Sequence, residues 1–155
     1  SIGRHLERLG FLADALARAI ETGAVFEAGG FEAVVALFDS TITFHAQYQL
    51  RRDMPALLDL LVIDHDNPRA LAWVAQTLRG RIAKIEEAAG ADARPLVQGI
   101  PMPPPLTVLC AQDNGHAALR AYLRQCVAGA WQLSDLLATR YFTHSAGTLP
   151  HSLGA

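Results

Sequence analysis

The sequence lacks the short motifs that identify most enzymes. It contains no glycine-rich phosphate loop, no nucleophile elbow, no HExxH element and no Cys-x-x-Cys pair. Its two cysteines, Cys110 and Cys126, form no metal-type pair, so we expect reduced thiols in a cytoplasmic protein. The residues alone therefore predict no cofactor, no metal site and no particular reaction.

A strong charge of one sign and a long apolar run are also missing. The formal net charge is −2, with 13 basic and 15 acidic residues. A basic excess would be needed to follow a phosphate backbone, so we expect no nucleic-acid partner. No apolar run reaches the roughly 18 residues of a membrane span, and the charged residues in positions 1–20 argue against a signal peptide. We therefore expect no membrane partner.

What the sequence does contain is helical periodicity. Of its 155 residues, 51% are hydrophobic, which suits one domain with a packed core. Apolar residues recur every three or four positions along segments 2–20, 31–45, 71–89 and 119–141. The pattern predicts an all-α fold, an antiparallel helical bundle of about five helices with one Pro-rich crossover loop. We expect the domain over residues 1–144 and an irregular tail over 145–155.

Three local expectations follow from the same patterns. The second helix should run without a break to about residue 52 and bury a neutral His45 on its apolar face. Asp53 should cap a short third helix that has Pro55 in its first turn. The proline run 101–105 should form an extended crossover before the last long helix.

The stretch "DHDNPR", residues 64–69, admits two interpretations. Asp66 or Asn67 could cap a helix that starts at Pro68, where the missing N–H is harmless. Alternatively, Asp64, His65 and Asp66 could bind a metal or transfer protons. Three consecutive residues cannot all point one way, and no second element completes a metal site, so we favour the helix start.

The first helix carries a charged face with an aromatic residue in it. At 100° per residue, the residues opposite the apolar seam are Arg4, Glu7, Phe11, Asp14 and Arg18. A solvated face explains the ionic residues but not Phe11, because a large aromatic side chain among charges suggests that something covers it. We predict that this face is covered by missing N-terminal helices of a longer protein or by a second copy.

Three segments resemble a known family. "GRHLERLGFLADAL", residues 3–16, resembles the Gly-Arg-x-x-Glu-Arg-Ala helix of the alpha-E domain, a bacterial all-helical family. "LLVIDHDNPRALAWVAQTL", residues 60–78, resembles its Leu-Leu-x-Asp-x-x-Asn-Pro-Arg-Ser stretch, and "LSDLLATRYF", residues 133–142, is similar to its closing helix. This chain departs from the pattern at Leu9-Gly10, where Ala-Asp is common, and at Ala70, where Ser is usual. Family members tend to be longer, so we expect this chain to be a C-terminal part.

The resemblance implies a role beside ATP-grasp proteins in peptide ligation or modification, with an ATP-grasp-type ligase or the missing N-terminal part as partner, and a possible homo-oligomer. The motif positions are Arg4, Glu7, Arg8, Asp64, Asn67, Pro68 and Arg69.

Two hypotheses remain open. The chain is either a non-catalytic module that holds a partner, an acidic peptide or a phosphate group, or an enzyme acting on a peptide or a phosphorylated substrate. In the second case, Glu7 is the candidate catalytic residue, a general acid or base, and Arg4, Arg8 and Arg69 clamp an anion. The enzyme requires these groups to converge in one cleft.

Overall fold

Helices are the only regular secondary structure in the part of the chain that the structure describes. The computed structural model describes residues 1–92 and 94–153, with side chains as far as Arg140. No strand occurs within these ranges, which confirms the all-α prediction. The elements are α1 (Ile2–Glu21), the 3₁₀ turn η1 (Ala24–Phe26), α2 (Ala28–Leu37), α3 (Thr41–Tyr48), α4 (Met54–Leu58), the π-helical turn η2 (Asp59–Ile63), α5 (Leu71–Ala88), α6 (Arg94–Gln98), α7 (Leu106–Leu109) and α8 (Asp113–Leu153).

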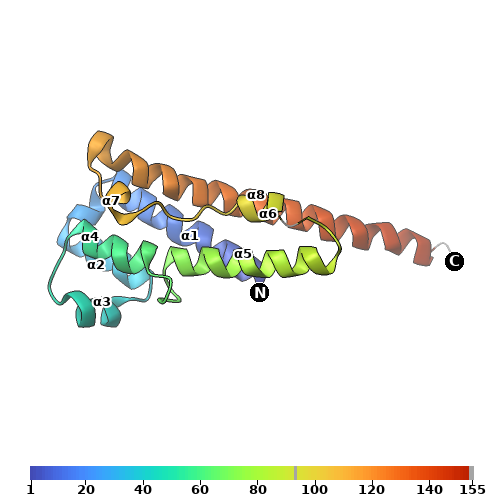
Figure 1. The fold of residues 1–155 in the computed structure, drawn as a ribbon, viewed down its shortest axis with the longest axis horizontal. Helices are drawn as coiled ribbons and strands as arrows, with labels where there is room; N and C mark the ends of the chain where they lie inside the picture. The colour runs from blue at the N-terminus through green and yellow to red at the C-terminus, as the bar shows by residue number, and fades with distance from the viewer. Residues whose placement is uncertain (93, 154–155) are drawn as a thin grey trace.

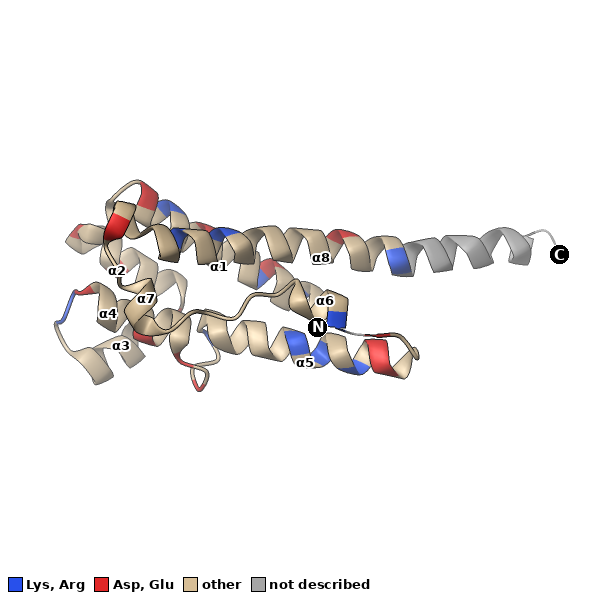
Figure 2. Ribbon diagram, turned by 45° about the horizontal axis from the view of Figure 1, so that its top comes forward, with Lys and Arg blue, Asp and Glu red and all other residues tan. Residues whose placement is uncertain are grey.

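Three long helices form the body of the molecule. Helix α1 packs against α8 and α5 and runs antiparallel to both, while α2, α3 and α4 gather at one end (Figure 1). Charged residues of both signs are spread over the helices, and on α5 they gather in the C-terminal half (Figure 2). Among the described residues, no helix combines the length and the apolar character that crossing a bilayer requires.

The first helix follows its sequence pattern closely. Ser1 caps it by accepting a hydrogen bond from the backbone N–H of Arg4 at 3.4 Å. The expected seam lies in the core: the buried members are Leu6, Leu9, Ala13, Leu16 and Ile20. Each buried leucine stabilises the fold by about 1.5–3 kcal/mol, so the seam fixes which side of α1 faces solvent. Helices α1 and α8 lie close together at Gly10, where a Cβ would lie 3.5 Å from the Ala130 Cβ, in ordinary van der Waals contact.

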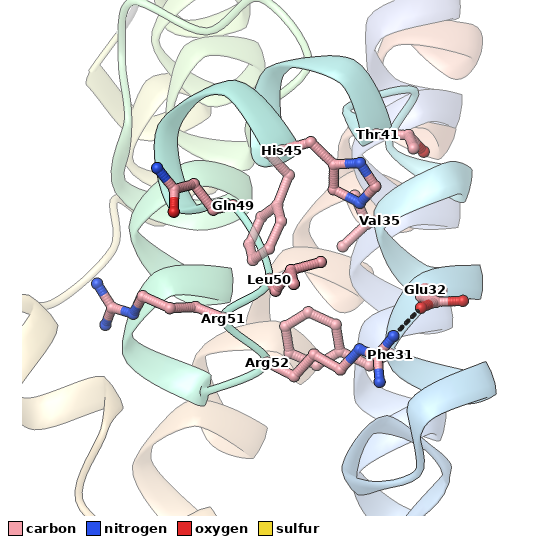
Figure 3. Close-up of a pocket in the computed structure, with 10 residues that line it drawn as sticks. Phe31, Glu32, Val35, Thr41, His45, Gln49, Leu50, Arg51 and Arg52 are labelled. Atoms are coloured by element: carbon pink, nitrogen blue, oxygen red, sulfur yellow. Dashed lines mark hydrogen bonds and ion pairs between the residues drawn. The ribbon is translucent and has the colours of Figure 1, made fainter.

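The second predicted helix is broken, and the prediction of a buried His45 is wrong. Asp39 adopts a left-handed backbone, with φ of 49°, and separates α2 from α3. The change of direction turns Phe44 into the core and leaves His45 exposed, with Ile42 86% exposed. Figure 3 shows the His45 imidazole beside Thr41 and Val35 at the rim of a shallow hollow. The apolar spacing continued across the break and therefore could not reveal it.

The short helix α4 begins after Asp53 as predicted, and a π-helical turn, η2, follows it where the prediction had one continuous short helix. The Asp53 carboxylate accepts a hydrogen bond from the Ala56 N–H at 2.9 Å, and Pro55 lies in the first turn, which confirms the predicted cap. The leucines that follow are buried, namely Leu57, Leu58, Leu60 and Leu61. The wider π-helical turn η2 then brings the chain to the "DHDNPR" segment.

The expectation that Pro68 begins a helix is wrong by three residues. Helix α5 starts at Leu71, after Ala70, whose backbone is extended. Asn67 is 7% exposed; its side-chain amide donates to the Leu60 carbonyl at 3.1 Å and accepts from the Arg69 N–H at 3.2 Å. The amide N–H of Asn67 is therefore bonded to η2 and its oxygen to the backbone of the following turn. Asn67 holds this loop against the core and does not cap α5.

The proline-rich crossover is extended, as predicted, and lies between the short helices α6 and α7. It packs directly on α8: a Cβ at Gly129 would lie 2.2 Å from the Gly99 carbonyl oxygen. From α5, the guanidinium of Arg79 donates to the carbonyls of Val97 at 3.0 Å and Ile100 at 2.7 Å. The crossover is therefore part of the packed structure, with Ile100 fully buried.

Two details at the far end of the bundle differ from expectation. On α5 the inward position belongs to Glu86, which is 2% exposed, while Ile85 is 40% exposed. The Glu86 carboxylate is paired with Arg140 of α8 at 2.7 and 2.8 Å. Helix α8 continues to Leu153, in contrast to the irregular tail predicted from residue 145. Extending an existing helix needs no apolar periodicity, because only its nucleation is costly.

Candidate functional site

The exposed face of α1 presents Arg4, Glu7, Arg8 and Phe11. Phe11 is 60% exposed and lies between the other side chains in helical projection. Glu7 and Arg8 are adjacent in sequence, so their side chains leave the helix about 100° apart. They consequently line two different hollows, one on each side of Phe11.

The first of these, which we call the Arg8 hollow, joins three distant segments of the chain. It is open, holds about 570 Å³, and is lined by Arg8, Phe11, Leu12, Leu37, Asp39, Pro68 and Arg69. The guanidinium of Arg69 donates from Nε to Asp39 Oδ2 at 3.0 Å. Within the described residues, Arg8 has no ion pair. Two guanidinium groups and one carboxylate therefore share an opening whose other walls are mainly apolar.

The second, the Glu7 hollow, lies between α1 and α8. It is small, about 20 Å³, and is lined by Leu6, Glu7, Gly10, Ala130, Trp131 and Ser134. Trp131 is 62% exposed, so its indole lies open beside the Glu7 side of the helix. The described part of the chain offers the Glu7 carboxylate neither an ion pair nor a hydrogen bond.

A family model covers nearly all of this structure. The model is Alpha-E, described as a predicted alpha-helical domain with a conserved ER motif, and it matches residues 1–142. The chain belongs to the Alpha-E family. Glu7-Arg8 is the only Glu-Arg dipeptide in the sequence, so the ER motif of this Alpha-E domain lies on the exposed face of α1. No curated protein and no solved structure matches the chain.

Of the other residues predicted as motif positions, Pro68 and Arg69 line the Arg8 hollow, whereas three lie apart from both hollows. Arg4, Asp64 and Asn67 line neither of them. Asp64 closes its own turn by accepting a hydrogen bond from the Asp66 N–H at 2.9 Å. Over the described residues, no three His, Cys, Asp or Glu side chains come together as a metal site. The Asn-Pro-Arg segment instead positions Arg69. The hydrogen bonds of Asn67 hold this loop in place, and Arg69 at its end lines the Arg8 hollow.

The other charged residues of α1 are paired. Arg124 of α8 donates to Asp14 at 2.9 Å and to Glu21 at 2.8 Å, and Arg18 donates to Asp14 at 2.9 Å. The hydrogen bonds from Arg124 lower the pKa of Glu21. This half of the charged face therefore holds α1 to α8, whereas Arg4 and the ER motif have no ion pair within the described residues. Nothing in the sequence spacing indicates Arg124, because it is about a hundred residues away.

The cysteine thiols and the half-buried Tyr48 carry raised pKa values. Burial raises the pKa of Cys126 to about 12, with a small opposing effect from Tyr122, and burial also raises the pKa of Cys110. Tyr48 donates a hydrogen bond to Asp59, and burial together with that carboxylate raises its pKa to about 12. These groups stay protonated near neutral pH, so they do not supply a nucleophile.

A third hollow lies on the opposite side of α2 and contains no motif residue. Phe31, Val35 and Phe44 form its floor, and an ion pair between Arg52 and Glu32, at 2.5 Å, closes one side (Figure 3). It holds about 40 Å³. Its two rim arginines are already paired, since Arg51 donates to Asp53, so the hollow has an apolar floor and an internally neutralised rim.

Proposed function

We propose that this Alpha-E domain is a non-catalytic binding module that holds an anionic group of a peptide or protein partner in the Arg8 hollow. The observation that carries the proposal is the meeting of Arg8, which has no ion pair in the described structure, with Arg69 in one open hollow. Guanidinium groups recognise carboxylates and phosphates through paired, charge-assisted hydrogen bonds. Phe11 and Leu37, both more than 45% exposed, offer apolar surface for the atoms next to the anion.

The same geometry gives less support to an enzyme. A reaction with Glu7 as acid or base requires its carboxylate to reach the group that the arginines clamp. Glu7 lines the hollow against α8, and Arg8 lines the hollow against α2, with Phe11 between them. An anion held by Arg8 and Arg69 therefore lies on the other side of Phe11 from the candidate acid or base.

The partner we propose is an ATP-grasp-type ligase acting in peptide ligation or modification in the cytoplasm, where ATP is available. The support for this part is the family membership together with the chemistry of the hollow. Forming a peptide bond consumes a free carboxylate, so the peptides or partners of such a system carry the group that two guanidiniums recognise. We also propose that the exposed Phe11 is covered in the assembled protein. The cover is that partner, further N-terminal helices or a second copy of the chain.

The proposal is tested with two peptides that differ by one charge. Ac-Ala-Leu-Ala-Glu-NH₂ carries an apolar residue and a carboxylate, and Ac-Ala-Leu-Ala-Gln-NH₂ is its neutral match. In NMR titrations we expect the Glu peptide to shift signals of Arg8, Phe11 and Arg69, with affinity that falls as salt is raised. Arg8→Gln should weaken this binding by about tenfold, the loss of one charge-assisted hydrogen-bonded pair.

Arg81→Gln supplies the matched control, because Arg81 is an exposed arginine of α5 that lies outside the hollow. Equal binding of the Glu and Gln peptides, or an Arg8→Gln protein that binds as tightly as the Arg81→Gln protein, would overturn the proposal. Co-expression with an ATP-grasp-type protein from the same genome tests the partner: we expect co-purification with the unchanged domain and its loss with Arg8→Gln.

A further inference from the structure

The Glu7 hollow combines two features that the anion-binding proposal does not use. The Glu7 carboxylate is exposed and makes no ion pair within the described residues, although Asp14 and Glu21 on the same helix are both paired with Arg124. Trp131, on the neighbouring helix α8, lines the same hollow and is 62% exposed. A free carboxylate and an open indole therefore border one opening, and the pair comes from segments more than a hundred residues apart.

We propose that Glu7 and Trp131 form a binding site for a basic side chain, lysine or arginine, of a protein partner. A carboxylate attracts the positive charge, and the indole face attracts the same charge through its quadrupole while covering the aliphatic stem. Tryptophan is the aromatic residue best suited to this contact. The two groups reinforce each other only for a cation; an anion would be repelled by Glu7, and an apolar group would gain nothing from it.

The packing of α1 on α8 explains why the two groups meet. Gly10 has no side chain, and its Cβ position is in van der Waals contact with Ala130, so the two helices approach closely at the floor of the hollow. Glu7 lies one turn before Gly10, and Trp131 lies next to Ala130, which places them at the rim of the same small opening. The hollow is too small for a whole ligand, so it suits the end of one side chain.

This site is independent of the Arg8 hollow, because Glu7 and Arg8 face opposite sides of Phe11. If both sites are occupied, the ER motif binds opposite charges on the two sides of one exposed aromatic ring. A partner surface that fits would present a basic residue and an acidic residue on either side of an apolar one. Such a charge pattern would fix the orientation of the partner as well as its identity.

The experiment uses the single-tryptophan variant Trp73→Phe, in which Trp131 is the only indole of the chain. The ¹⁵N-labelled protein is titrated with N-acetyl-lysine-N-methylamide and, separately, with the N-acetyl-norleucine analogue, which keeps the aliphatic stem without the charge. We expect the lysine probe to shift the Trp131 indole N–H signal and the norleucine probe to have little effect. Glu7→Gln should weaken the lysine response by roughly fivefold.

Arg81→Gln is the matched control, because this exposed arginine of α5 lines neither hollow, and it should leave the lysine response unchanged. Because Glu7 is exposed and unpaired, we expect Glu7→Gln to unfold at the same temperature as the parent, so a changed response would report binding and not folding. Equal responses to the lysine and norleucine probes, or a Glu7→Gln protein that responds like the parent, would overturn the inference.

Discussion

Replacing Asn67 by alanine tests whether this residue fastens the loop that carries Arg69. The substitution removes two hydrogen bonds, from the side-chain amide to the Leu60 carbonyl and from the Arg69 N–H to the side-chain oxygen. At about 0.5–1.5 kcal/mol for each bond, we expect a loss of about 2 kcal/mol in the free energy of unfolding. A simple helix cap would cost about 1 kcal/mol.

The measurement is urea unfolding followed by helical circular dichroism. With a slope near 2 kcal/mol per molar urea, a loss of 2 kcal/mol lowers the midpoint by about 1 M. Asn67→Asp separates the two bonds, because the acid keeps an oxygen for the Arg69 N–H but cannot donate to Leu60. We expect Asn67→Asp to be at least as destabilising as Asn67→Ala, since it also buries a charge beside a carbonyl.

The matched control is Asp66→Ala, one position earlier, where the side chain is exposed. It should change stability by no more than about 0.5 kcal/mol. If Asn67→Ala resembles this control, or if Asn67→Asp is as stable as the parent, then the bond to Leu60 contributes nothing and the proposed role of Asn67 is refuted. We also expect Asn67→Ala to weaken binding at the Arg8 hollow, because Arg69 loses its anchor.

The remaining predictions concern the packing of the bundle and its response to acid. Gly129→Ala should destabilise the fold by about 1–3 kcal/mol, because a Cβ would lie 2.2 Å from the Gly99 carbonyl oxygen. Gly80→Ala should stabilise the fold by about 0.5–1 kcal/mol, because a Cβ there would meet no atom within 4 Å. Thermal unfolding of the two variants beside the parent protein tests both expectations. Arg140→Met should cost about 2–3 kcal/mol in urea unfolding because it leaves the Glu86 carboxylate buried without its partner, and the double change Glu86→Leu with Arg140→Met should recover most of the loss. The hydrogen bond from Arg51, assisted by the Ala56 N–H, lowers the pKa of Asp53. The ionised Asp53 therefore stabilises the fold above its unfolded-state pKa near 4, and this stabilisation is lost as the pH falls through the lower folded-state pKa. Asp53→Asn should make the free energy of unfolding less dependent on pH below about 4, and an unchanged pH dependence would contradict this.

The parts of the fold that could be predicted are those set by local periodicity. The α1 seam, the Asp53 cap and the extended proline run depend on residues within one or two turns, and all three are confirmed. The break at Asp39 could not be predicted, because the left-handed backbone of this residue does not alter the spacing of the apolar residues around it. The same break explains why His45 is exposed and not buried as predicted.

The sequence predicts only some residues of the candidate site and not how they come together. Arg8 and Arg69 were both identified as motif residues, but their meeting in one hollow depends on the turn at Asn67 and on the packing of α2. Trp131 was not identified, because an isolated tryptophan on a long helix has no spacing that connects it to Glu7. Glu86 was missed because its neighbour Ile85 continues the apolar pattern, while the pairing with Arg140 decides which of the two turns inward.

The pairing of α1 with α8 has a consequence for how the chain folds during synthesis. The ion pairs between these helices join residues 103 to 110 positions apart in sequence, from Glu21 and Asp14 to Arg124. Helix α1 therefore leaves the ribosome before α8, and its packing surface against α8 forms only after α8 has emerged. Until the segment around Arg124 has emerged, the seam from Leu6 to Ile20 has only α5 and the short helices to cover it. A chain interrupted before that point would expose this apolar surface, which makes early truncation products the species that we expect to aggregate.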